Sequence, residues 1–193
     1  MTDASGHGPG HNHRTRARRF TEVVHGVADW DAPTPVAEWR ARDVVAHLTE
    51  WFPGFLVAGT DIHLPSGPSA TDDPVGAWEH QRDEVQAVLD HPATSHRTYC
   101  SKMLPEMPLP EVIDQFYTAD VFMHTWDLAR ASGQDDTLDE DQCAAMLHGM
   151  SAMEDRIRAS GQFGEQQPVR EDASIQQRFI AFIGRDPYWS PPA

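Results

Sequence analysis

Basic residues are scarce in this chain. Its 193 residues include 15 lysines and arginines against 30 aspartates and glutamates, which gives a formal net charge of −15. A surface with this charge repels the phosphate groups of nucleic acids. The composition therefore excludes a protein that binds DNA or RNA through a broad basic face.

Cysteines and long apolar runs are scarce as well. The two cysteines, Cys100 and Cys143, form no C-x-x-C motif and no disulfide framework. Cys143 lies in an apolar stripe and is expected to be a packing residue, whereas Cys100 is expected to be a passive thiol. No apolar run approaches the roughly 18 residues of a transmembrane helix, and no signal-peptide pattern is present. We expect a cytoplasmic protein that binds neither membranes nor nucleic acids.

Several common sequence signatures are absent. The chain has no glycine-rich phosphate loop, no nucleophile elbow and no H-E-x-x-H motif. It also lacks any sustained alternation of apolar and polar residues, which excludes a large half-buried sheet. Apolar residues instead recur at helical spacing. The predicted fold class is all-α.

The helical stripes divide the chain into segments. They predict helices over residues 14–30, 42–56, 73–89, 110–132 and 139–157, and a short last helix over 172–183. Pro53 lies inside the second stripe and is expected to kink or break that helix, because proline lacks an N–H. Residues 91–108 show no period and are expected to be irregular. The prediction is a bundle of four main antiparallel helices with a short additional C-terminal helix.

The N-terminus is rich in glycine and histidine and has little to bury. We expect residues 1–14 to form a disordered tail and residues 15–193 to form the helical bundle. His7, His11 and His13 in this tail either bind a transition metal loosely or are simply solvated, and the solvated state is favoured. His91 and His96, in the irregular segment, are further candidate ligands.

The most informative stretch carries a carboxylate and an imidazole at helical spacing. Asp120 and His124 are four residues apart, so their side chains lie on one face of the predicted helix. Asp120 shares that face with Ile113 and Phe116, and a carboxylate among apolar neighbours is costly unless it is paired or bound to a cation. A catalytic zinc typically takes three protein ligands. The leading candidate for the third is His47, on another helix; the alternative is a solvated pair without a metal.

Asp127 follows His124 by three residues and allows two interpretations. It either accepts a hydrogen bond from a metal-binding imidazole, as such histidines usually require, or forms a surface ion pair with Arg130. The sequence does not decide between them.

Three motifs, in order and spacing, carry a family resemblance. They are Trp39-x-x-Arg42-Asp43-Val-Val-Ala-His47-Leu48, Asp120-x-x-x-His124-Thr-Trp-Asp127-Leu-Ala-Arg130 and Gly184-Arg-Asp-Pro187-x-Trp189. From about residue 15 onward the chain resembles the actinobacterial branch of the DinB superfamily, which is related to the N-terminal domain of mycothiol-dependent maleylpyruvate isomerase. The resemblance implies a DinB-like four-helix bundle with a divalent metal, usually zinc, held by the residues at positions 47, 120 and 124. Asp120 stands where the isomerase domain has a glutamate.

The ligand pattern and the resemblance together predict a divalent-metal-dependent enzyme. The expected activity is that of a transferase or isomerase using a low-molecular-weight thiol, such as mycothiol, as a metal-bound thiolate. Two alternatives stay open: a hydrolase that works through metal-bound hydroxide, and a non-catalytic protein that binds a metal or a small ligand. The expected partners are a small-molecule thiol and an unknown small substrate.

Overall fold

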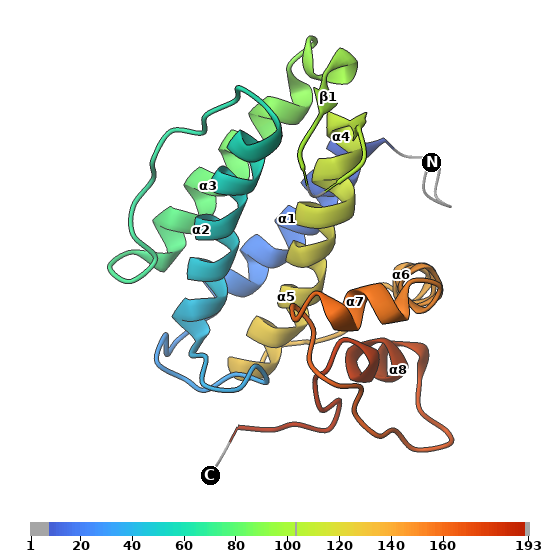
Figure 1. The fold of residues 1–193 in the computed structure, drawn as a ribbon. Helices are drawn as coiled ribbons and strands as arrows, with labels where there is room; N and C mark the ends of the chain where they lie inside the picture. Colours follow the sequence, from blue (N-terminus) through green and yellow to red (C-terminus); the bar gives the residue numbers. More distant parts are fainter. Residues whose placement is uncertain (1–7, 103, 192–193) are drawn as a thin grey trace.

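The computed structural model describes residues 8–102 and 104–191, and within these ranges the chain folds into a bundle of helices (Figure 1). The elements of the bundle are α1 (Pro9–His25), α2 (Ala41–Gly59), α3 (Pro74–Asp90), α4 (Leu109–Val112), the π-helix η2 (Ile113–Thr118) and α5 (Ala119–Ala131). Three further helices follow: α6 (Glu140–Ser151), α7 (Glu154–Ala159) and α8 (Ile175–Phe182). The all-α prediction is confirmed.

Helices α1 and α5 run in the same direction. Near their starts, the Asn12 amide donates a hydrogen bond to Asp114 Oδ2 at 2.9 Å. Near their ends, the Gln134 amide donates to the carbonyl oxygen of Val23 at 2.8 Å. Helices α1 and α5 are therefore parallel, and α2 and α3 run in the opposite direction (Figure 1).

Helices α2 and α3 are also parallel to each other, because the loop between them returns along the length of the bundle (Figure 1). Arg42, at the start of α2, donates to the carbonyl oxygen of Thr71 just before α3. Tyr99, which follows α3, donates to the carbonyl oxygen of Phe55 near the end of α2. The predicted antiparallel arrangement therefore holds between the two pairs and not within them.

Two groups of buried apolar side chains form the core. The larger lies among α1, α2, α3 and the α4–α5 segment, with Phe20, Phe52 and Trp78 fully buried. The smaller joins one face of α5 to α6 and α8. Cys143 belongs to this second group, as predicted for a packing residue, and its burial, with nearby acidic charges, raises its pKa to about 12.

The first helix begins earlier than predicted. It starts at Pro9, a favourable first helical residue, and Asn12 and His13 are buried in it. The His13 ring shares a hydrogen bond with the Gln86 side chain at 2.8 Å. The predicted disordered tail is therefore wrong for residues 9–14, because polar contacts, invisible in the composition, hold this turn. His7 lies outside the described residues.

Three local details differ from the sequence prediction. Helix α2 continues through Pro53 to Gly59, so the proline does not break it, and the predicted kink stays a prediction. The segment predicted to be irregular holds a short 3-10 turn, η1 (Thr94–His96), and a small antiparallel hairpin of β1 (Thr98–Tyr99) and β2 (Met107–Pro108). The stretch from Ile113 to Thr118 is a π-helix, a form often found near functional sites.

Candidate metal centre

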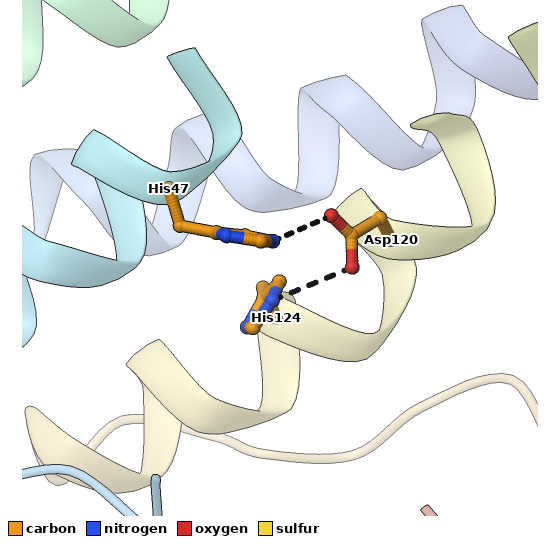
Figure 2. A group of neighbouring side chains, drawn as sticks. All are labelled: His47, Asp120 and His124. Atoms are coloured by element: carbon orange, nitrogen blue, oxygen red, sulfur yellow. Dashed lines mark hydrogen bonds and ion pairs between the residues drawn. The ribbon is translucent and has the colours of Figure 1, made fainter. Parts of the chain in front are cut away.

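The three predicted metal ligands meet between α2 and α5 (Figure 2). His47 projects from the second turn of α2. Asp120 and His124 stand one turn apart at the start of α5, as their spacing predicted. The contact between antiparallel α2 and α5 brings the histidine of one helix to the pair on the other.

The distances suit a metal ion. His47 Nε2 lies 2.9 Å from Asp120 Oδ2, and His124 Nε2 lies 3.4 Å from Asp120 Oδ1. One ligand atom from each residue lies within 4.8 Å of the others. Zinc bonds of about 2.0–2.1 Å place tetrahedral ligands about 3.3 Å apart. In the described part of the chain, His47, Asp120 and His124 form the one group of three such side chains that could hold a metal ion.

Asp120 is charged despite its burial. Burial alone would raise the pKa of its carboxyl group, but the adjacent imidazoles of His124 and His47 outweigh burial and bring the pKa below its usual value. A negative carboxylate between two imidazoles is the donor set expected for a site that binds a divalent cation.

Trp51 holds the carboxylate from a second side. Its indole N–H donates a hydrogen bond to Asp120 Oδ2 at 3.0 Å. Trp51 follows His47 by one helical turn, so α2 supplies both groups that contact this oxygen. Trp51 was not among the residues predicted for the site, although its spacing of four residues from His47 was a usable signal.

His124 is fixed by a buried carboxylate. Its Nδ1 lies 2.8 Å from Asp127 Oδ2, and Asp127 is fully buried. In a metal-bound state, Nδ1–H would donate to Asp127 and Nε2, on the side of Asp120, would supply the lone pair, which is the arrangement a metal-binding histidine needs. Arg130 pairs with Asp136 instead, so the alternative of a surface pair between Asp127 and Arg130 is wrong.

Arg185 completes this chain of contacts from the C-terminal segment. Its guanidinium donates to both oxygens of Asp127, at 3.3 and 3.1 Å. Burial would raise the pKa of Asp127, but Arg185 and His124 outweigh burial and lower it. The Gly184-Arg-Asp-Pro187 stretch, part of the third motif of the family resemblance, thus supplies a positioning residue.

The centre is shielded on one side and accessible on another. The Trp39 ring lies 5.1 Å from the ring of His47 and 5.7 Å from that of His124, measured between centroids. The His124 side chain is only 4% exposed, whereas that of His47 is 32% exposed. The His47 side of the centre is therefore partly open to solvent.

The other histidine candidates lie elsewhere. His11 is exposed on α1, and His13 is buried against Gln86. His91 and His96 are exposed around η1. None of them joins the three residues of the centre.

Comparisons with known proteins find relatives without a known function. The chain is 28% identical over 160 residues to two uncharacterized proteins of Mycobacterium tuberculosis, MT0763 of strain CDC 1551 / Oshkosh and Rv0738 of strain ATCC 25618 / H37Rv. The aligned region spans 79% of this chain and 83% of each relative. No family model and no solved structure matches the chain. No helix in the described part of the chain has the length and apolar character needed to span a membrane.

Proposed function

We propose that the protein is a divalent-metal-dependent enzyme, a transferase or isomerase that uses a low-molecular-weight thiol such as mycothiol. The observation that carries the proposal is the meeting of His47, Asp120 and His124, with the His47 side chain partly exposed to solvent. Two imidazoles and one carboxylate favour zinc, and three protein ligands leave a coordination position for a substrate.

We also propose that the chain belongs to the DinB superfamily, in the branch related to the N-terminal domain of mycothiol-dependent maleylpyruvate isomerase. The helical bundle, the ligand set shared between α2 and α5, and the mycobacterial relatives support this placement. The cytoplasmic location expected from the sequence is part of the same proposal, since thiols are kept reduced there.

The residues around the ligands have separable tasks. His47, Asp120 and His124 would hold the cation. Trp51 fixes one oxygen of Asp120, and Asp127 fixes the ring and tautomer of His124. A divalent cation in such a site lowers the pKa of a coordinated thiol, which is ordinarily about 8.5.

The thiol has to come from outside the chain. Cys143 is buried in the second core group, and Cys100 is exposed beside β1 and is not among the residues of the centre. With a net charge of −15, the surface offers no general attraction for anionic substrates, so the cation supplies the local positive charge. Both observations favour a small cofactor thiol.

Calorimetry of thiol binding tests the proposal. Mycothiol, or a soluble analogue, is titrated into zinc-loaded and metal-free protein in buffers of different ionisation enthalpy. We expect binding to the zinc-loaded form with release of close to one proton at pH 7, and much weaker binding to the metal-free form. Equal binding with and without zinc would contradict the thiol role and leave the hydrolase and the binding protein as the remaining functions.

A further inference from the structure

Beside the metal centre, two rows of side chains face each other between α2 and the η2–α5 segment. Each row has three residues at intervals of four, the spacing that puts side chains on one face of a helix. We call the two rows together the seam; its residues are His47, Trp51 and Phe55 on one side and Phe116, Asp120 and His124 on the other.

The rows pair residue by residue in opposite directions. The rings of His47 and His124 are 4.8 Å apart. The Trp51 indole donates to Asp120, one turn farther along α2. One more turn along, the rings of Phe55 and Phe116 are 5.6 Å apart. The seam is therefore polar at the metal centre and aromatic at its other end.

The aromatic end is partly open to solvent. Trp51, Phe55 and Phe116 are all incompletely buried, whereas Phe52 and Tyr117, next to them in the sequence, are fully buried. Large aromatic side chains gain most from full burial, so a row left partly exposed beside a candidate active site marks a surface that a ligand can cover.

The aromatic end is also rigid. The Phe55 ring stacks on the buried Tyr99 ring at 4.9 Å with an angle of 17° between the planes. The Trp51 ring is held at 5.4 Å from that of Phe55 and by its hydrogen bond to Asp120. A surface fixed in this way needs no rearrangement to receive a flat apolar group.

We propose that the aromatic end of the seam binds an apolar, planar group on the ligand whose head is held at the metal centre. The inference rests on the proposed function and adds the substrate class: a molecule with a metal-binding head and an uncharged aromatic tail. At a rise of 1.5 Å per residue, Trp51 and Phe55 lie roughly 6 and 12 Å along α2 from His47. A metal–sulfur bond of about 2.3 Å, a two-carbon link and a phenyl ring together reach roughly 9 Å. The ring therefore lies over Trp51, and its far edge comes within the contact distance of about 4 Å from the pair Phe55 and Phe116.

A matched pair of small thiols tests the inference. Ethanethiol and 2-phenylethanethiol carry the same head and differ only in the phenyl ring. Each is titrated into protein loaded with cobalt in place of zinc, and binding is followed by the visible absorption of cobalt. We expect 2-phenylethanethiol to bind at least about tenfold more tightly, because the ring covers the exposed aromatic surface.

Variants locate the effect. Phe55→Ala and Phe116→Ala should reduce the preference for the phenyl compound to less than about threefold, while ethanethiol affinity stays unchanged. Phe55→Leu and Phe116→Leu repeat the test with less loss of packing. Val57→Ala is the control, since Val57 is exposed on α2 outside the seam, and it should retain the full preference.

The outcomes separate this inference from the proposed function. Equal affinity for the two thiols, or a preference that survives both phenylalanine variants, overturns the seam as a tail site even if thiols bind. If neither thiol binds, acetohydroxamate and benzohydroxamate give the same comparison with another metal-binding head. If benzohydroxamate then binds more tightly than acetohydroxamate, and the variants at Phe55 and Phe116 lose this difference, the seam is supported as a tail site although the thiol role fails. A seam covered by a second copy of the chain would show as a dimer in sedimentation with no preference in either pair, and would overturn the inference.

Discussion

The imidazole of His124 shows how single residues define the centre. One ring nitrogen faces Asp120 and the other contacts Asp127, whose oxygens both accept hydrogen bonds from Arg185. The ring is therefore fixed in orientation before any ligand arrives. Loss of such a hydrogen bond usually weakens metal binding without removing a ligand.

The variant Asp127→Asn tests this role. We expect zinc affinity to fall about 10–100-fold, because the amide cannot hold the His124 ring and tautomer as the carboxylate does. Competition with a chromophoric chelator, well below the unfolding temperature, measures the change. Arg130→Gln is the control, since Arg130 pairs with Asp136 instead. Unchanged affinity in Asp127→Asn would contradict the positioning role.

His13 is a second residue whose environment has a measurable consequence. Burial lowers its pKa from 6.5 to about 4, so the folded protein keeps it neutral where the unfolded chain would protonate it. Its contribution to stability is present above about pH 6.5 and is lost as the pH falls toward 4. Between pH 7 and pH 5 the loss is about 2 kcal/mol.

Urea unfolding of wild type and His13→Phe in the presence of chelator measures this contribution. We expect the free energy of unfolding to fall more between pH 7 and pH 5 in the wild type than in the variant, by about 2 kcal/mol. Contributions from all other groups are common to the two proteins and cancel in the difference. Identical pH dependence in the two proteins would show that His13 is not held neutral.

At the level of elements, the end of α8 controls where Arg185 lies. Gly184 ends the helix with φ of +91°, a conformation that L side chains rarely adopt. A Cβ at this position would lie 2.6 Å from the Cα of Gly164. The turn therefore needs glycine, and Arg185 follows it directly into contact with Asp127.

Gly184→Ala should lower the free energy of unfolding by at least about 1–2 kcal/mol, from the backbone conformation alone. It should also weaken zinc binding, because Arg185 would shift from Asp127. Gly149→Ala is the matched control: Gly149 is exposed inside α6 with no atom near its added Cβ, and the change should stabilise the protein by up to about 1 kcal/mol. A Gly184→Ala protein as stable as the wild type would refute the argument.

At the scale of the whole molecule, the sequence predicted the helices and the meeting of His47, Asp120 and His124 better than the connections. That these residues bind a metal stays a prediction. The stripes located the four long helices, and the spacing of Asp120 and His124 indicated a shared face. The direction of α3 was not predictable, because the loop over residues 60–73 has no hydrophobic pattern from which its course could be predicted. The contact of Arg185 with Asp127 spans 58 residues and leaves no local pattern. Pro53 suggested a break that α2 does not show, and no sequence signal indicated the π-helix. Packing overrides local preference at both places.

The candidate metal centre lies at one of the helix contacts of the bundle, that between α2 and α5. The central claim is that this contact binds one metal ion through His47, Asp120 and His124. Because the apolar groups on α1, α2, α3 and α5 carry the fold, removing one ligand should abolish binding and leave the helices intact. Circular dichroism of each variant checks that condition.

Elemental analysis of purified protein after incubation with zinc and desalting is the most direct test. We predict one zinc per chain in the wild type and in His25→Ala, a control that removes a histidine paired with a carboxylate, Glu79, outside the centre. We predict little or no zinc in folded His47→Ala and His124→Ala. A full equivalent of zinc in His124→Ala, or no zinc in the wild type, would contradict the assignment of the metal centre.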